Sequence, residues 1–331
     1  MHPRWQKGGV ETTNERWATI LSKQNLELIA LTFNAQVDDA KEIRLINFSN
    51  LTDVLIFIVK NLRRSDTLLL CQSYYLLKVL PALVFLKLKG CRLFLAERNS
   101  FDQYNEFPIK RKLYSLIFPW IFKIFDKIIL NSSEMALEAL YRKCHKNIVI
   151  FKNPRFTKEE IKILEAIIPK KSSKSVYTFC RWSEQKDRDF MIRAAELFSK
   201  NFVEFTVFCN ANSHSFQRPF VTSAFLHMME HPSILFFCSK FEGYPNLLLE
   251  ARVLGLPIVY SHCNTGVSEI LEGYPLAYKF EKKSLESLKD AYSRAAESSE
   301  KFLCIPDMDI ALKHSEYLID SKQFVEAFVN G

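Results

Sequence analysis

Glycine is scarce in this chain of 331 residues, which contains only 8. Average proteins carry about 7% glycine, so the few that remain are expected where the backbone or a close contact tolerates no side chain. The eight cysteines stand singly between Cys71 and Cys304, without a Cys-x-x-Cys pair or metal-ligand spacing. Such usage is typical of a reducing compartment, in which cysteines serve as small buried side chains.

Targeting and recognition signals are missing as well. Met1 to Trp5 lacks the apolar core of a secretory signal, and four cations interrupt the most apolar run, Leu76 to Leu95. No metal motif, P-loop or nucleic-acid motif stands out, and the seven histidines are dispersed. We therefore expect a cytoplasmic protein that uses no metal or other cofactor and binds no nucleic acid.

The chain is long enough for two domains, and 48% of its residues are apolar, enough for two full cores. Strand-like runs alternate with helical patterns, which predicts α/β domains with parallel sheets. We place a Rossmann-like domain at 1–152, a second at 153–312 and a terminal helix at 313–331, with Lys170 to Lys174 as linker. Predicted strands are 26–33, 43–48, 67–71, 92–96, 127–130, 148–151, 176–180, 203–209 and 234–238.

The most informative stretch runs from Ser239 to Glu269. After the strand 234–238, Gly243-Tyr244-Pro245 has turn chemistry, and apolar residues then recur at helical spacing until Gly255. The pattern predicts strand, tight turn, helix and strand. Pro245 suits the first helical turn, and Gly255 suits the position just after the helix.

A helix that starts at the carboxyl end of a strand directs free N–H groups into the crevice above the sheet, where a phosphate can bind. Glu242 on the turn and Glu250 in the helix flank that place. Because a carboxylate repels phosphate, the two acids are better used to accept hydrogen bonds from sugar hydroxyls. The competing interpretation is two surface acids on an ordinary strand–helix–strand unit.

This pattern resembles the signature of retaining glycosyltransferases of family 4: seven residues separate Glu242 from Glu250, and Gly-Leu-Pro-Ile-Val follows. The resemblance implies the GT-B fold, with two Rossmann-like domains facing a central cleft and a C-terminal helix packing back on the first. It also implies metal-independent transfer of a sugar from a UDP- or GDP-linked donor, with retention at the anomeric carbon.

Two cations follow the strand 176–180, at the sheet edge expected for Glu242. Arg181 and Lys186 would stabilise charge on a leaving diphosphate, and the family carries such a pair here, usually within Gly-Arg-Leu and Lys-Gly. In this chain the charges match but the glycines do not; the alternative is an exposed basic pair on a loop. By the resemblance, Arg181, Lys186 and Glu242 are catalytic, Glu250 holds the ribose, and the donor site includes Gly8, Gly9, Gly243, Tyr244, Asn246 and Leu247.

The chain departs from the family in several places. Only seven residues precede the Gly-Gly loop at Gly8, so we expect the first strand to be missing or shortened. Segment 210–231 is short, so a helix and a strand are expected to be absent or contracted, and Gln72-Ser73 replaces a frequent histidine. Glu97-Arg98-Asn99 resembles a tripeptide of bacterial relatives that would touch donor or acceptor, but a structural role is equally open.

The implied acceptor is a lipid-linked or oligosaccharide glycan at the inner membrane of a bacterium, as in lipopolysaccharide, O-antigen or capsule assembly. Two alternatives remain open: a non-catalytic remnant or partner subunit, and a sugar-nucleotide epimerase. The aromatic stretch Leu113 to Lys127, after Lys110-Arg111-Lys112, suggests peripheral contact with anionic membrane. We favour a helix packed against the sheet as its explanation.

Overall fold

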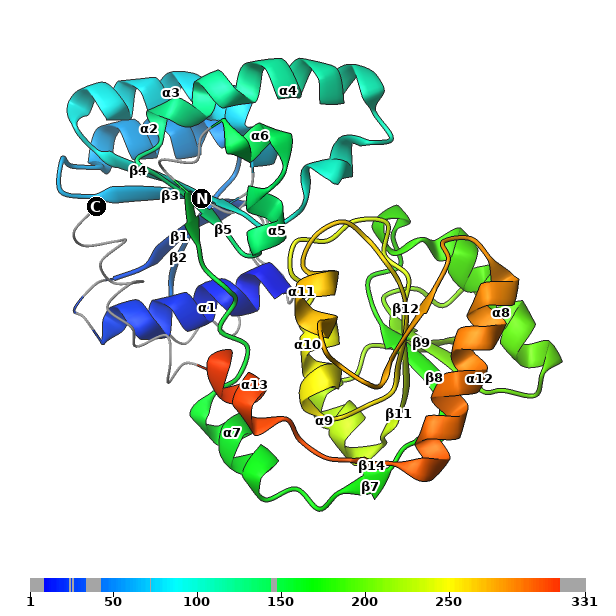
Figure 1. Ribbon diagram of the computed structural model, residues 1–331. Helices are drawn as coiled ribbons and strands as arrows, with labels where there is room; N and C mark the ends of the chain where they lie inside the picture. The colour runs from blue at the N-terminus through cyan, green and yellow to red at the C-terminus, as the bar shows by residue number, and fades with distance from the viewer. Residues whose placement is uncertain are drawn as a thin grey trace. The chain divides into compact units, whose positions relative to one another are not determined.

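The computed structural model of the protein describes residues 9–23, 25, 27–33, 43–71, 73–143 and 148–315. The chain forms two compact units, which divide between Phe156 and Thr157 and again between Lys313 and His314. The main sheet of each unit is parallel and is covered by helices (Figure 1).

Unit 1 alternates helices and strands, and its predicted strands are confirmed to within a few residues. The order is α1 (Gly9–Ser22), β1 (Ile29–Phe33), β2 (Arg44–Phe48), α2 (Leu51–Asn61), β3 (Thr67–Cys71), α3 (Leu76–Lys89), β4 (Arg92–Glu97), α4 (Pro108–Ile121), β5 (Lys127–Leu130), α5 (Ser133–Ala136), α6 (Ala139–Arg142) and β6 (Ile148–Ile150). A 3-10 turn, η3 (Phe122–Ile124), follows α4 directly.

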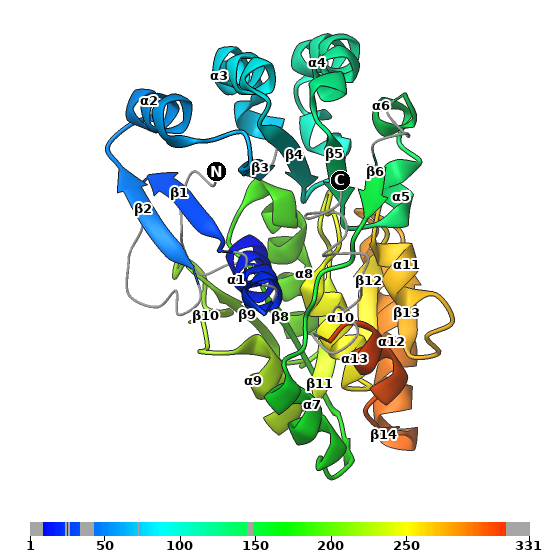
Figure 2. The same ribbon diagram turned by 90° about the vertical axis from the view of Figure 1, so that its left-hand side faces the viewer.

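The strands of unit 1 bury side chains on both faces, since successive residues of a strand point to opposite sides. Leu68 and Leu70 of β3 join the core formed with α2, α3 and α4. Leu69 and Cys71 join a second core with Trp17 of α1. Figure 2 shows this arrangement, with α1 on one side of the strands and the row of α2, α3 and α4 on the other.

The described strands of unit 1 form two sheets, β1-β2 and β3-β4-β5-β6. A cavity of about 490 Å³ lies between β1 and β3 and is lined by both strands, by α1 and by the end of α2. The expectation of a missing first strand concerns the residues before Gly9, which lie outside the described part of the chain.

Unit 2 contains the remaining elements. The order is α7 (Lys158–Glu165), β7 (Lys170–Lys171), β8 (Ser173–Phe179), α8 (Arg188–Lys200), β9 (Phe205–Cys209), β10 (Gln217–Pro219), α9 (Ala224–Glu230), β11 (Ser233–Phe237), α10 (Asn246–Val253), β12 (Ile258–Ser261), α11 (Val267–Leu271), β13 (Ala277–Phe280), α12 (Leu285–Lys301), β14 (Leu303–Cys304) and α13 (Met308–Lys313). Within this unit, α8 and α12 cover one face of the large sheet and α9, α10 and α11 the other (Figure 1).

The large sheet of unit 2 has the order β10-β9-β8-β11-β12-β13, with all neighbours parallel. The chain runs outward from β8 in one direction and, after crossing over to β11, outward in the other. This is the doubly wound order, and ligands of such sheets bind at the carboxyl ends of the two strands where the direction reverses. The ligand site of unit 2 is therefore expected at the carboxyl ends of β8 and β11.

One prediction about connections needs correction, and the other is confirmed. The segment Lys170 to Lys174 is not a linker: Lys170 and Lys171 form β7, which pairs antiparallel with β14 inside unit 2, and β8 starts at Ser173. Its Lys/Ser composition is that of a loop, but the pairing with a distant strand overrides composition. Segment 210–231 is contracted, the second of the two expected alternatives: it keeps a helix and a strand, as the short α9 and β10.

The chain returns to unit 1 immediately after α13. The amides of Arg155 and Phe156 both donate to the carbonyl oxygen of His314, and Phe156 bridges Ser315. The predicted helix 313–331 lies, from residue 316 onward, outside the described residues.

Candidate functional site

The loops that follow β8 and β11 are joined to each other by main-chain and side-chain hydrogen bonds. The amide of Lys240 donates to the carbonyl oxygen of Gln185 at 2.8 Å, and Nε2 of Gln185 donates to the carbonyl oxygen of Phe241 at 3.1 Å. The thiol of Cys238 donates to the carbonyl oxygen of Lys186 at 3.4 Å. The two loops at the reversal point of the sheet therefore form one continuous surface.

Two predicted site residues meet across these loops. Nζ of Lys186 makes an ion pair with Oε1 of Glu242, and both side chains are largely buried. Burial alone would lower the pKa of Lys186, but the charge of Glu242 and its hydrogen bond outweigh burial and raise that pKa. Lys186 is therefore a fixed positive charge at neutral pH.

Arg181, the other predicted cation, is exposed and makes no hydrogen bond or ion pair with the described residues. It is close enough to Lys186 that its charge acts to lower the pKa of that lysine. The next amide, of Trp182, donates to Oδ1 of Asn210 at 2.8 Å, which anchors the loop. Arg181 is thus a cation on a fixed loop with its charge still available.

Asp187 stands where the resembling family usually has glycine. Its backbone is left-handed, with φ +50°, at the start of α8. A side chain is costly in this conformation, but aspartate tolerates it better than most residues. The loop therefore keeps the backbone shape that glycine would allow.

A third loop, after β12, packs on the second. Oγ1 of Thr265 donates to the carbonyl oxygen of Glu242. Gly266 has φ +70°, and a Cβ there would lie 2.2 Å from the carbonyl oxygen of Gly243 and 2.9 Å from Cα of Tyr244. Only glycine fits this contact, which fixes the backbone of the Glu242 loop.

The predicted helix after this loop is confirmed, one residue later than expected at its start. Pro245 is the N-cap, α10 begins at Asn246, and Gly255 follows the helix with φ +70°. Asn246 and Leu247 are half-buried at the start of α10, whereas Gly243, Tyr244 and Glu250 are buried. Burial raises the pKa of the Tyr244 hydroxyl.

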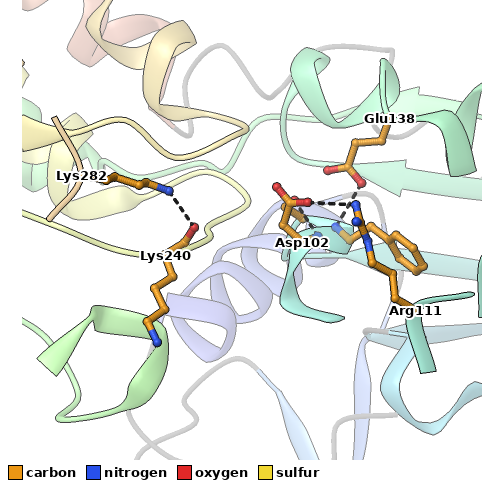
Figure 3. Close-up of polar contacts among 7 residues, drawn as sticks. Asp102, Arg111, Glu138, Lys240 and Lys282 are labelled. Carbon is orange, nitrogen blue, oxygen red and sulfur yellow. Dashed lines mark hydrogen bonds and ion pairs between the residues drawn. The ribbon is translucent and has the colours of Figure 1, made fainter. Parts of the chain in front are cut away.

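Sequence reasoning missed one ion pair of this site. Nζ of Lys240 pairs with Oε1 of Glu184, beside the Lys186–Glu242 pair. Figure 3 shows that Nζ of Lys282 approaches the carbonyl oxygen of Lys240, at 3.4 Å. No spacing in the sequence signals these contacts, because the residues belong to separate loops.

Glu97 and Arg98 of unit 1 are buried at the end of β4. Nη1 of Arg98 donates to Oδ1 of Asn153 at 3.0 Å, and the guanidinium lies 4.0 Å from the ring centroid of Trp17. Burial lowers the pKa of Arg98 to about 10, so the residue stays charged at neutral pH. These contacts tie Arg98 to Asn153 and to α1 within unit 1. For Glu97, Arg98 and the half-buried Asn99, a contact with donor or acceptor stays a prediction.

Two carboxyl groups of unit 1 have raised pKa values. Burial raises the pKa of Glu97 to about 7, against the lowering effect of the nearby Ser73, and burial also raises the pKa of Glu138 to about 7. Glu138, which sequence reasoning missed, accepts from the amide of Phe101 at 3.0 Å (Figure 3). Both groups are partly protonated at neutral pH.

Gly8, Gly9, a metal site and a membrane-spanning helix are the other predictions or expected absences. Gly8 lies outside the described residues, and Gly9 is the first residue of α1. Among the described residues, no cluster of His, Cys, Asp or Glu has the arrangement of a metal site. Within the same part of the chain, no helix combines the length and apolar character needed to span a bilayer.

No protein-family model and no curated protein sequence matches this chain. Solved structures do match it. TarM has a TM-score of 0.62 and 15% identity, over 85% of this chain and 59% of TarM. The lipopolysaccharide outer core galactosyltransferase WaaB has a TM-score of 0.58 and 18% identity, over 99% of this chain and 98% of WaaB. Sucrose-phosphate synthase from Thermosynechococcus elongatus has a TM-score of 0.65 and 12% identity, over 98% of this chain and 96% of the synthase.

The chain has the GT-B fold. In GT-B terms, unit 1 is the N-terminal domain and unit 2 the C-terminal domain. The chain spans about three fifths of the length of TarM, 59%, and almost the whole of WaaB. At these identities the similarity establishes the fold, and the chemistry has to be argued from the residues.

Proposed function

We propose that this GT-B protein is a retaining glycosyltransferase that takes a sugar from a UDP- or GDP-linked donor bound by unit 2. The observation that carries the proposal is the group formed by Arg181, Lys186 and Glu242 at the carboxyl ends of β8 and β11. A cation with no partner among the described residues, beside a buried ion pair, is suited to an anionic ligand that carries hydroxyl groups.

Each residue has a proposed role. Arg181 binds the donor diphosphate by two oxygens, and Lys186 adds a fixed positive charge while it orients Glu242. Glu242 accepts a hydrogen bond from the donor sugar, and Glu250 accepts from the ribose hydroxyls. The start of α10, at Asn246 and Leu247, offers backbone N–H groups and the positive end of the helix dipole to the phosphates.

The chemical step follows from this charge distribution. The bond between the anomeric carbon and the donor phosphate oxygen breaks, and the acceptor oxygen bonds to the anomeric carbon on the same face. The acceptor proton passes to the departing phosphate oxygen, and Arg181 and Lys186 stabilise the charge that remains on the diphosphate. The proposed step uses no metal ion, because Arg181, Lys186 and the positive end of the α10 dipole together offset the charge of the leaving diphosphate.

The names of similar structures support the class of donor. A TarM mutant structure contains UDP and α-GlcNAc-glycerol, and the pneumococcal O-GlcNAc transferase GtfA contains UDP and GlcNAc. Starch synthase IV from Arabidopsis thaliana contains ADP and acarbose. WaaB and WaaG act in lipopolysaccharide biosynthesis by their names, which supports a lipid-linked glycan as acceptor. That this glycan is of O-antigen or capsule type, reached from the cytoplasmic membrane surface, is part of the proposal.

The test is transfer from a panel of labelled nucleotide sugars to a membrane lipid extract. Arg181→Ala should lower turnover by about 10²–10³, as loss of a single transition-state donor does elsewhere. Glu250→Gln should weaken binding of the nucleotide by about 10- to 100-fold, because it loses a charge-assisted hydrogen bond. Lys200→Ala, an exposed lysine at the end of α8, is the matched control and should change neither.

Three outcomes would contradict the proposal. Epimerised nucleotide sugar without transfer would make the protein an epimerase. Neither transfer nor nucleotide binding would make it a non-catalytic member of the fold. Transfer that Arg181→Ala leaves at the normal rate would remove Arg181 from the mechanism.

A further inference from the structure

Helix α4 exposes a row of apolar side chains on its outer face. Ile109, Leu113, Leu116 and Trp120 recur at intervals of four, three and four residues, which places them on one stripe of a helix. All are exposed, Ile109 by 84% and Trp120 by 71%. The opposite stripe, with Phe118, is buried in the core of unit 1. Packing against the sheet therefore explains only one face of this helix.

Helix α3 repeats the same pattern. Leu77, Pro81, Val84 and Leu88 recur at the same intervals, and all four are exposed, Leu88 by 84%. Its buried stripe, which includes Leu83, faces the same core as the buried stripe of α4. Figure 2 shows α3 and α4 next to each other in the layer that covers one side of the unit 1 strands. The two apolar rows thus belong to one side of this unit.

The charges on these two helices have a single sign. Their sequences contain six Lys and Arg residues and no Asp or Glu. Lys87 pairs with Asp126 at 2.5 Å, and Arg111 pairs with Asp102 at 3.4 Å, as Figure 3 shows for the second pair. The other four are Lys78, Lys89, Lys110 and Lys112, none of which has a carboxylate partner among the described residues.

Aromatic and basic side chains are also coupled at both ends of α4. Nζ of Lys123 lies 4.2 Å from the ring centroid of Trp120, and Nζ of Lys110 lies 5.0 Å from that of Phe107. Tryptophan favours the boundary between lipid headgroups and acyl chains, where its ring is buried and its N–H stays hydrated. Lysine beside it can reach the phosphates of the same boundary.

The apolar rows and the charges together indicate the kind of partner. Rows of exposed apolar side chains on two neighbouring helices mark a binding surface, and the excess of positive charge on them requires an anionic partner. A second copy of the chain is disfavoured, because a twofold interface would bring two basic faces together. An anionic bilayer offers negative headgroups at its surface and apolar chains just below them.

We propose that the outer faces of α3 and α4 dock on an anionic lipid bilayer. Leu88, Ile109, Leu116 and Trp120 enter the upper acyl region, and the lysines of both helices contact lipid phosphates. The inference rests partly on the proposed function, since it names the surface that brings a transferase to a lipid-linked acceptor. Lipid binding itself requires no turnover, so the two can fail separately.

The experiment measures sedimentation of the full chain with phosphatidylcholine vesicles that contain or lack phosphatidylglycerol. We expect binding that requires phosphatidylglycerol and weakens as salt is added. The double variant Leu116→Ser/Trp120→Ser and the double variant Lys110→Glu/Lys112→Glu should each bind at least about tenfold more weakly, since both apolar burial and basic charge contribute.

The matched control is Lys200→Glu/Phe202→Ser, which changes an exposed cation and a side chain that is 99% exposed in unit 2. It should leave vesicle binding within about twofold of the original, since it lies outside α3 and α4. Unfolding temperature and UDP binding should be the same in all variants, because the altered residues lie outside the core and the donor site.

Several outcomes overturn the proposal. They are absence of binding to phosphatidylglycerol vesicles, equal binding to neutral vesicles, and binding that the α4 variants leave intact. Dimers in sedimentation equilibrium that Leu116→Ser/Trp120→Ser dissolves would identify a second copy as the partner instead. Vesicle binding without transfer from any nucleotide sugar would leave this inference standing and would contradict the proposed function.

Discussion

Gly266 holds the loop after β12 against the loop that carries Glu242. We predict that Gly266→Ala weakens UDP binding and lowers the unfolding temperature. The left-handed backbone alone costs about 1–2 kcal/mol with a side chain, and the new Cβ would lie 2.2 Å from the carbonyl oxygen of Gly243. That oxygen belongs to the backbone, so the loop has to move. Calorimetric titration with UDP and thermal unfolding measure the two effects.

Gly273→Ala is the matched control for this prediction. Gly273 has nearly the same backbone, φ +67°, but a Cβ there would meet nothing within 4 Å. It should therefore show only the backbone cost of about 1–2 kcal/mol and normal UDP binding. Equal effects of the two substitutions would mean that the contact of Gly266 with Gly243 does not shape the site.

Glu97 makes stability depend on pH. Burial raises its pKa to about 7 in the folded chain, from the ordinary value of 4.5. The folded state therefore binds more protons than the unfolded state between these values, and stability falls as pH rises through this window. Above pH 7, the buried charge of Glu97 lowers the free energy of unfolding by roughly 3 kcal/mol, and Glu97→Gln should remove this cost. Between pH 5 and pH 8, the unfolding temperature of the variant should rise relative to that of the original protein. A constant difference in unfolding temperature across this range would contradict the prediction.

The residues of the candidate site could be predicted from the sequence only where a local pattern of neighbouring residues marks them. Glu242, Gly243 and Glu250 stand in one continuous pattern of strand, turn and helix, so the loop and helix that carry them could be placed before the structure. Glu138 and Lys240 could not, because burial and an ion pair with a distant loop give them their properties. Asp187 is a third case, because the sequence has no glycine there to indicate the left-handed backbone that the structure shows.

At the scale of elements, the pair Lys186–Glu242 joins the loops after β8 and β11. The side chains are 19% and 10% exposed. We predict that Lys186→Met lowers the free energy of unfolding by about 2–4 kcal/mol, because it leaves the carboxylate of Glu242 buried without its cation. Adding Glu242→Gln should recover part of this loss. Chemical denaturation of the two single variants and the double variant measures the coupling.

The neighbouring pair Lys240–Glu184 is the natural control. It joins the same two loops, but its side chains are 27% and 43% exposed. Lys240→Met should cost at most about 1 kcal/mol, because water screens a pair of this exposure. If both lysine variants cost the same, burial is not what makes the Lys186 pair strong.

Elements were predictable where their own periodicity decides them. The strands of unit 1 and the central strands β8, β9 and β11 of unit 2 could be read from apolar runs, because parallel strands covered on both faces are apolar throughout. The edge strands β10 and β13 were not predicted. The segment Lys170–Lys171 could not, because its strand conformation comes from pairing with Leu303 and Cys304. The outer faces of α3 and α4 form an intermediate case: their pattern is visible in the sequence, but only exposure shows which stripe the core leaves uncovered.

At the scale of the whole molecule, unit 2 has the properties of an independent domain. It is continuous in sequence, from Thr157 to Lys313, whereas unit 1 is assembled from two segments. Its first and last helices, α7 and α13, contact each other, so the two ends of the unit meet. The side chain of Thr157 caps α7 in a reciprocal pair with Glu160. Its core is formed by its own strands and by α8 and α12.

We therefore predict that a fragment of residues 157–313 folds alone and binds UDP within about tenfold of the affinity of the full chain, a difference of about 1.4 kcal/mol. Arg181, Lys186, Glu242 and Glu250 all belong to this unit, so the four residues to which the proposal gives donor roles are present without unit 1. Circular dichroism should show a cooperative transition, and calorimetric titration should give the affinity, with Arg181→Ala in the fragment as control. A folded fragment that does not bind UDP would mean that unit 1 supplies essential donor contacts, and the assignment of the donor site to unit 2 would be wrong.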